Sequence, residues 1–199
     1  LVLATLLGGS EASPLVERLQ YQLAVANGAW ASFSPRLDGG AFFVGCQPLK
    51  GHELGAHKAL WGVLLEVLEN GFSDEELARA KALIRGDRAL SIQTVESKAL
   101  DVLWNLQRTG DPDFGRRYLA QIESVTGAQV VEAARTLFRP EEATRALLVP
   151  MDGPEEDEFL LPQVSALNLS AGPKSSKLLR RTLQGGTTLL VEAGEPGSL

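Results

Sequence analysis

Two histidines and one cysteine are the side chains of this 199-residue chain whose types point most directly to chemistry. His52 and His57 bracket a segment that also contains Glu53. A zincin needs the spacing H-E-x-x-H, because residues i and i+4 place both imidazoles on one helix face. Here the second histidine is at i+5, about 140° further around a helix. We therefore expect His52 at a polar helix start and His57 on the helix flank, without a shared metal ion.

The single cysteine, Cys46, lies in an apolar strand pattern, where cysteine usually packs as a small hydrophobic side chain. One cysteine also excludes an internal disulfide, a zinc finger and an iron–sulfur cluster. Gly185-Gly186 is followed by neither Lys-Ser/Thr nor a helix pattern, so it is not a phosphate-binding loop. The residues by themselves predict no catalytic and no metal-binding side chain, and they identify no substrate-binding residue.

Two further motifs lie in the C-terminal third of the chain. The acidic cluster at 152–158 lacks the glycine and the spacing of an EF-hand loop, so we interpret it as a solvated linker and not as a calcium site. Asn168-Leu169-Ser170 matches a glycosylation acceptor, which has meaning only for a secreted eukaryotic protein. Neither motif predicts an activity.

Composition narrows the class of protein. With 44% hydrophobic and 22% charged residues the sequence is ordinary globular material. The net charge of −6 argues against a nucleic-acid partner, which usually meets a basic face. No apolar run reaches the roughly 18 residues of a membrane span, and no signal-peptide pattern opens the chain. Because the chain opens on Leu1 without a methionine, we expect a fragment or a processed chain.

The spacing of apolar residues and the capping residues predict the elements that must position these side chains. Leu15, Leu19 and Leu23 predict a helix that starts at Pro14 and ends at Asn27-Gly28. Ser73 with Glu76, and Thr126 with Gln129, form capping boxes. We expect further helices over 1–7, 52–69, 73–107 with a bend at Gly86, 114–122 and 126–138, and strands over 29–33, 41–46 and 145–149.

Composition changes after Pro150, where an acidic and then Pro/Gly-bearing stretch begins. We predict a domain over residues 1–150, a linker over 151–176, and the first β-hairpin of a following domain over 177–199. The hairpin pattern consists of apolar runs at 178–183 and 187–191 around a glycine turn.

Six segments carry a pattern that goes beyond local structure. They are Leu6–Ser10 followed by Ser13–Leu15, Gly40–Val44, Phe72–Lys81, Ile122–Val130, Ala133–Pro140 and Leu178–Val191. In this order, the first five segments resemble the second, non-catalytic domain of the pitrilysin/insulinase metallopeptidases, the inverzincins, over residues 1–150. The segment 72–81 is the most specific match, and 178–191 resembles the hairpin that opens a domain of this family. The resemblance implies an α+β, processing-peptidase/LuxS-like metallohydrolase fold, an antiparallel β-sheet with helices packed on one face.

The resemblance also says which chemistry to expect and where. The family's catalytic domain carries H-x-x-E-H, with two zinc-binding histidines and a glutamate as general base. This sequence contains no such pentad. The active halves of the family also use an Arg and a Tyr, and Gln20 and Asn27 stand at the matching positions here. Both departures imply a domain that does not assist catalysis directly, with zinc in the catalytic domain of the parent protein and no cofactor in this chain.

Three functions follow as hypotheses. The first is a non-catalytic domain of a zinc-dependent metalloendopeptidase, forming part of the substrate chamber and the interface with the catalytic half. The second is an inactive scaffold or partner subunit of processing-peptidase type, without proteolysis. The third is an α+β binding module unrelated to this family.

The partners expected under the first two hypotheses are a peptide or unfolded-protein substrate and a catalytic half, in the same chain or in a partner subunit. A homodimer is a further option. Family members hold a substrate as an added strand, so the edge of the strand at 29–33 or at 41–46 is the expected peptide site. We expect no nucleic acid, no membrane span, and a location in the bacterial cytoplasm or periplasm.

Overall fold

The computed structural model describes residues 1–36, 39–140, 142–149, 177–182 and 188–193. The chain divides into two compact units, residues 1–137 and 138–199. Each unit is described by itself. Cys46, His52 and His57, the side chains of chemical interest in the sequence, all lie in the first unit. No helix of the described part is long and apolar enough to cross a membrane.

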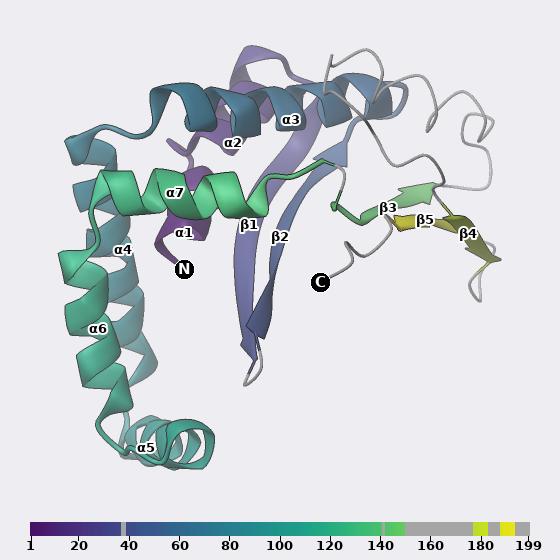
Figure 1. Cartoon of the computed structure of the whole chain (residues 1–199). Coiled ribbons are helices and arrows are strands. Elements are labelled where there is room, and N and C mark those ends of the chain that lie inside the picture. The colour runs from purple at the N-terminus through teal and green to yellow at the C-terminus, as the bar shows by residue number, and fades with distance from the viewer. Residues whose placement is uncertain (37–38, 141, 150–176, 183–187, 194–199) are drawn as a thin grey trace. The chain divides into compact units, whose positions relative to one another are not determined.

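The first unit contains all the helices of the described residues and one pair of strands (Figure 1). In chain order its elements are α1 (Val2–Gly8), α2 (Pro14–Val16), the π-helix η1 (Glu17–Gln22), β1 (Ala26–Arg36), β2 (Gly39–Pro48), α3 (Glu53–Asn70), α4 (Asp74–Ser91), α5 (Val95–Thr109), α6 (Phe114–Ser124) and α7 (Gly127–Leu137). The helices predicted at 1–7, 52–69, 114–122 and 126–138, and both strands, are confirmed to within a few residues at their ends.

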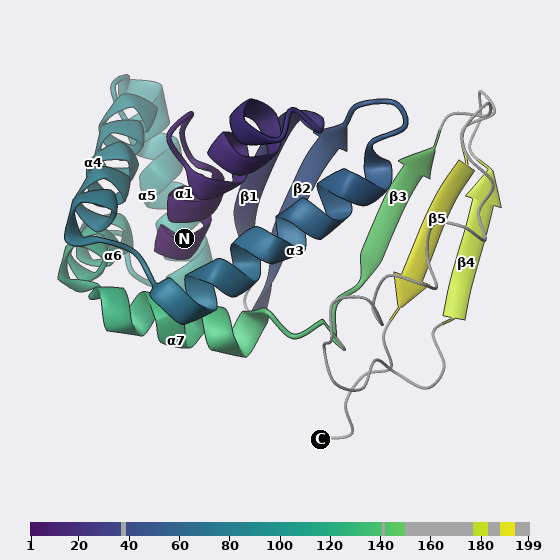
Figure 2. The same ribbon diagram turned by 90° about the horizontal axis from the view of Figure 1, so that it is seen from above.

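The two strands form an antiparallel ribbon with helices on one side. The ladder pairs Ala29 with Cys46 and Trp30 with Gly45. Because side chains alternate across a strand, Ala29 is buried beneath the helices while Trp30 is exposed on the other face. In Figures 1 and 2, α1 lies against β1 and α3 against β2. This is the predicted arrangement of an antiparallel sheet with helices on one face.

The core of the unit lies between the helices and the ribbon. Every helix of the unit except α5 contributes buried side chains. They include Leu3, Leu6, Leu7, Leu15, Leu19, Ala56, Val63, Leu64, Val67, Leu77, Ala80, Ile84, Ile122, Val130 and Ala134.

Gly8 and Gly9, at the end of the first helix, do not form a left-handed helix end. The residue after α1, Gly9, has a right-handed φ of −84°. A Cβ on Gly8 would overlap the backbone N of Ala31 and lie 2.8 Å from the carbonyl carbon of Trp30. Gly8 is therefore required because the helix backbone approaches the β1 backbone directly.

The helix predicted from Pro14 to Asn27-Gly28 is wrong in its second half. The chain changes to a π-helix at Glu17, and Leu23 donates its N–H to the carbonyl of Arg18, five residues back. The wider turn of a π-helix moves Leu23 off the buried stripe, so it is exposed. Asn27 and Gly28 lie in β1, not at a helix end.

Ser13 is the residue before this helix, but its side chain does not cap it. Its side chain makes no hydrogen bond to the helix that starts at Pro14. Its Oγ instead accepts the backbone N–H of Ser10 at 3.0 Å. The hydroxyl therefore stabilises the turn before the helix.

The single long helix predicted over 73–107 is also wrong, because two helices occupy this stretch. α4 ends at Ser91, and Thr94 starts α5 with its own capping box: Thr94 Oγ1 accepts the N–H of Ser97, whose hydroxyl accepts the N–H of Thr94. Gly86 lies inside α4 and is not the break. The capping boxes predicted at Ser73 and Thr126 are confirmed.

The second unit contributes a three-stranded sheet. β3 (Arg145–Val149), β4 (Lys177–Thr182) and β5 (Thr188–Ala193) are ordered β3-β5-β4, and both neighbouring pairs are antiparallel. The strand at 145–149 and the pairing of the two hairpin strands are as predicted. The glycine turn, the acidic cluster at 152–158 and the Asn168 motif lie outside the described residues.

Candidate functional site

The face of the β1–β2 ribbon turned away from the helices is the first candidate surface. Trp30 and Phe43 stand on it as diagonal neighbours, with 48% and 51% of their surfaces exposed. Ser32, opposite Phe43, is also exposed. Residues 26–35 and 39–48 contain no charged side chain. The face is therefore an uncharged surface with two aromatic rings on it.

Trp30 is held in place by the residue opposite it. A Cβ on Gly45 would lie 2.5 Å from Cζ2 of the Trp30 indole. The ring thus lies directly over the backbone of Gly45, where any larger residue would displace it. Cross-strand packing of an aromatic ring on glycine fixes the ring and leaves its other side exposed.

The edges of the ribbon are the second candidate feature. Within the part of the chain that the structure describes, β1 and β2 form a sheet of two strands, so each has one edge without a strand partner in that sheet. Such an edge carries N–H and C=O groups that can pair with an added strand. The strands at 29–33 and 41–46, one of whose edges is the expected peptide site, are the two strands of this ribbon. The uncharged aromatic face lies next to both of its edges.

The two histidines lie at the positions expected for them. His52 is the exposed residue before α3, and His57 is half-buried within the helix. Among the described residues no group of three His, Cys, Asp or Glu side chains is arranged to hold a metal ion. The pair therefore does not fit the zinc site of the resembled family, and no chemical step at zinc is derived for this chain.

Cys46 lies in β2 on the side of the ribbon that faces the helices. Its half-burial removes the thiolate from water, and this desolvation raises the pKa of the Cys46 thiol. A raised pKa lowers the population of the nucleophilic thiolate at neutral pH. The site favours the packing role that the sequence predicts.

Gln20 and Asn27, the counterparts of the family's Arg and Tyr, both lie where the backbone is irregular. Gln20 is half-buried in the π-helix η1. Asn27 is exposed at a β-bulge, since the register shifts between Ala26 and Gly28. Between them Ala24 has a φ of +49°, which is strained for a residue with a Cβ. Irregular segments of this kind often occur at functional sites, but here the side chains are neutral amides.

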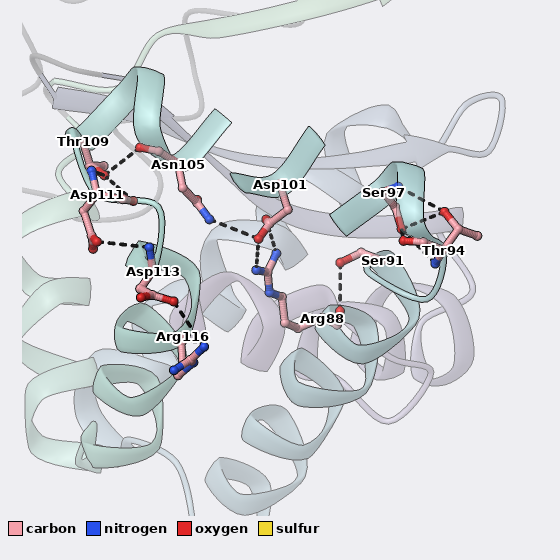
Figure 3. A network of polar contacts seen from close by, with 10 residues as sticks. All are labelled: Arg88, Ser91, Thr94, Ser97, Asp101, Asn105, Thr109, Asp111, Asp113 and Arg116. Carbon is pink, nitrogen blue, oxygen red and sulfur yellow. Dashed lines mark hydrogen bonds and ion pairs between the residues drawn. The ribbon is translucent and has the colours of Figure 1, made fainter. Parts of the chain in front are cut away.

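A polar cluster that was not predicted from the sequence joins α4, α5 and α6 (Figure 3). Arg88 donates from both terminal nitrogens to the two carboxylate oxygens of Asp101, at 2.5 Å each. Asn105 donates to the same carboxylate at 3.1 Å. A Cβ on Gly115 of α6 would overlap the Arg88 guanidinium and lie 3.2 Å from the Asn105 amide nitrogen. The glycine thus makes room for the ion pair.

The electrostatics of this cluster follow from its hydrogen bonds. The two hydrogen bonds from Arg88 lower the pKa of Asp101, although partial desolvation opposes them. The same contact raises the pKa of Arg88. The sequence contained one signal of this cluster. Asp101 and Asn105 are four residues apart, so they share one face of a helix that is otherwise rich in Leu and Val. Nothing in the sequence showed that Arg88, on a helix predicted to be continuous with theirs, would fold back to meet them.

Residues 1–84 match a family model, that of the peptidase M16 inactive domain. Over these residues the chain is similar to the inactive domain of the peptidase M16 family. The resemblance to the inactive domain of the metallopeptidase family is therefore confirmed over residues 1–84. No curated protein sequence matches the chain.

Solved structures share the fold of the M16 inactive domain. A peptidase M16 inactive domain from Pseudomonas fluorescens has a TM-score of 0.60 at 20% identity, over 69% of this chain and 33% of that chain. The inactive peptidase domain of a proposed zinc protease from Bordetella parapertussis has a TM-score of 0.60 at 21% identity, over 68% and 73% of the two chains. A protease from Helicobacter pylori has a TM-score of 0.57 at 19% identity, over 69% and 33%.

These likenesses establish the fold class predicted from the sequence. The identities are too low to carry function from one protein to another, so the comparison extends to the fold alone. The chain spans about a third of the length of the Pseudomonas fluorescens and Helicobacter pylori chains that it matches. The region similar to this chain is thus one part of these larger chains.

Proposed function

We propose that this chain is the non-catalytic domain of a zinc-dependent metalloendopeptidase, and that it forms one wall of the substrate chamber and the interface with the catalytic half. The observation that carries the proposal is the M16 inactive-domain match over residues 1–84. It is supported by the outward aromatic face of the β1–β2 ribbon, which no helix of the first unit covers.

The proposed role of the ribbon is to hold an extended, uncharged stretch of peptide. A peptide added to either edge would make main-chain hydrogen bonds, and every second side chain would lie on the face that carries Trp30 and Phe43. Aromatic rings supply large apolar contact areas and retain little motion to lose on binding. Along residues 26–35 and 39–48 charged peptide side chains would find no countercharge, because these residues carry none, and the one charged residue of the two strands is Arg36 at the end of β1.

In this proposal the chemistry is supplied by the catalytic half. Zinc bound there would polarise the scissile carbonyl and activate a water molecule. The residues of this chain would bind and orient the substrate, and Gln20 and Asn27 would take no part in proton transfer, since a neutral amide does not titrate in the accessible pH range.

The domain organisation predicted from the sequence stays part of the proposal. It comprises a domain over 1–150, a linker over 151–176 and the opening hairpin of a further domain over 177–199. The pairing of β4 with β5 supports the hairpin. Limited proteolysis with mass spectrometry tests the division: first cuts within 151–176 support it, and first cuts inside 1–137 contradict it.

Peptide binding is tested by titrating the chain with extended apolar peptides and following binding by calorimetry. We expect dissociation constants of roughly millimolar or tighter. Trp30→Ala should weaken binding several-fold, because it removes one of the two exposed rings. Trp104→Ala is the matched control, since Trp104 is a similarly exposed tryptophan on α5.

The outcomes separate clearly. Binding that is weakened by Trp30→Ala and unchanged by Trp104→Ala supports the ribbon face as the peptide site. Absence of binding at millimolar peptide, or equal loss in both variants, contradicts it.

A further inference from the structure

Asparagine comes directly before glycine at two places in the sequence, Asn27-Gly28 and Asn70-Gly71. Glycine has no Cβ to hinder its backbone nitrogen, and its backbone adopts more conformations than that of any other residue. The glycine nitrogen can therefore reach the side-chain amide carbon of the preceding asparagine, which is among the thermolabile residues of proteins. Both asparagine side chains are exposed. A difference in reactivity between these two chemically identical dipeptides must come from the fold around them.

Asn27 lies at an irregular point of the β1–β2 ladder. Ala26 and Gly28 pair with consecutive residues of β2, so Asn27 between them has no partner residue. A β-bulge leaves such a residue outside the regular ladder. Gly28 has a negative φ, and a Cβ on it would meet nothing within 4 Å. The Asn27 side chain and the Gly28 nitrogen therefore have room to approach each other.

Asn70 is held by a helix end instead. It is the last residue of α3, and the backbone N–H of Gly71 donates to the carbonyl oxygen of Val67 at 3.0 Å. Gly71 also lies close to α7, because a Cβ on it would be 3.3 Å from Cγ2 of Val131. The nitrogen of Gly71 must leave its hydrogen bond before it can react, and this requires a local opening of the helix end.

We propose that Asn27 is a site of spontaneous deamidation and that the fold protects Asn70 from the same reaction. The nitrogen of Gly28 forms a bond to Cγ of Asn27, and the bond from Cγ to Nδ2 breaks. The proton of the Gly28 N–H leaves with the side-chain nitrogen as ammonia, and a succinimide ring remains. Water then opens this ring at one of its two carbonyl carbons, so the reaction needs no other reactant.

The two products change the start of β1 in different ways. Attack of water at Cγ gives an ordinary aspartate, which places a negative charge in the stretch 26–35 that otherwise carries none. Attack at the main-chain carbonyl carbon gives an isoaspartate, in which the chain reaches Gly28 through the former side chain. The backbone is then longer by a methylene group at the bulge, a few residues before Trp30. This inference does not depend on peptide binding or on zinc.

Incubation of the full chain at mildly alkaline pH, followed by digestion and mass spectrometry, tests the inference. Deamidation replaces an amide NH2 by OH, and chromatography separates the peptides that contain aspartate from those that contain isoaspartate. In the folded chain we expect Asn27 to convert several-fold faster than Asn70. In urea, where both dipeptides lose their surroundings, the two rates should be similar.

Gly28→Ala is the variant that tests the nucleophile. Its methyl group meets no neighbour but hinders the backbone nitrogen, so conversion of Asn27 should slow several-fold while that of Asn70 stays unchanged. Gly62→Ala is the matched control, since a Cβ there also meets nothing within 4 Å and the residue before it is Trp61. It should leave both rates unchanged. Circular dichroism shows whether each variant has folded.

The comparison of the two sites in the wild-type chain needs no variant. Equal rates in the folded chain, faster conversion of Asn70, or an Asn27 that stays intact in the folded chain while both sites convert in urea overturns the inference. A folded Gly28→Ala chain in which Asn27 converts as fast as in the wild type overturns it as well.

Discussion

At the residue scale, the space around each glycine distinguishes positions that require it from positions that only tolerate it. Gly8 lies against the backbone of β1, and Gly115 lies against the Arg88 guanidinium. Gly86, within α4, has nothing within 4 Å of where its Cβ would be. The same residue type therefore has opposite consequences for stability at these positions.

Substituting alanine at Gly8 and at Gly86 should change stability in opposite directions. Gly8→Ala should lower the free energy of unfolding by about 1–3 kcal/mol, because backbone atoms must move to admit the methyl group. Gly86→Ala should raise it by roughly 1 kcal/mol, because alanine favours the helix and meets no neighbour. Urea denaturation measures both values. A neutral Gly8→Ala would show that α1 does not pack on β1 as described.

The Arg88–Asp101 pair should give stability a component that depends on acid pH. Arg88 lowers the pKa of Asp101 in the folded chain below its unfolded value. A depressed carboxyl pKa contributes stability above the unfolded pKa of about 3.9 and loses it as pH falls through the folded pKa. The free energy of unfolding, measured by denaturation from pH 7 to pH 2, should therefore fall less steeply below pH 4 in Asp101→Asn than in the wild type.

The contribution itself should be modest, about 1 kcal/mol or less, since both side chains keep roughly a quarter of their surfaces exposed. Glu132, which pairs with Arg135 one turn away on a fully solvated face, provides the control substitution Glu132→Gln. Identical pH profiles for the wild type and Asp101→Asn would show that the pair does not stabilise the fold.

At the element scale, the break between α4 and α5 depends on capping and not on hydrophobic spacing. The apolar positions continue through residues 83–103, so periodicity alone predicts one helix. Thr94 and Ser97 satisfy each other's backbone N–H groups and start a new helix. The turn lets Asp101 meet Arg88 from a second helix instead of lying further along the same one.

Removing the cap should loosen α5 more than the rest of the unit. Thr94→Ala should cost about 1 kcal/mol, because the N–H of Ser97 loses its acceptor. Hydrogen exchange should become faster at the α5 amides first, since no α5 residue is buried in the core. Ser73→Ala, which removes the equivalent cap of the core helix α4, should instead reduce protection across the first unit. Uniform exchange in both variants would contradict this difference.

At the scale of the whole molecule, the first unit is a two-stranded ribbon with helices on one side, and we propose that zinc chemistry belongs to a catalytic half and not to this unit. The prediction that this chain binds no zinc follows from the i+5 spacing of His52 and His57 and from the missing H-x-x-E-H. The structure brings no third metal-ligating side chain to them within its described residues.

Metal analysis of the purified chain should therefore find no stoichiometric zinc after dialysis against zinc-containing buffer. The result is expected because the imidazoles of His52 and His57 do not form a tetrahedral site by themselves. One zinc per chain, lost in both His52→Ala and His57→Ala, would contradict the assignment and place a metal site at the start of α3.

The sequence determined whatever depends on neighbours along the chain. Capping boxes at Ser73 and Thr126, the alternation in β1 and β2, and the absence of a zinc pentad were all readable from it, and so was the family resemblance. Tertiary structure decided what depends on residues distant along the chain. Periodicity does not reveal that α1 needs Gly8 to meet β1, that η1 widens and turns Leu23 outward, or that Arg88 of α4 meets Asp101 of α5. The physical reason is that local signals report the conformation of a segment, whereas the direction in which its faces point is set by packing against other segments.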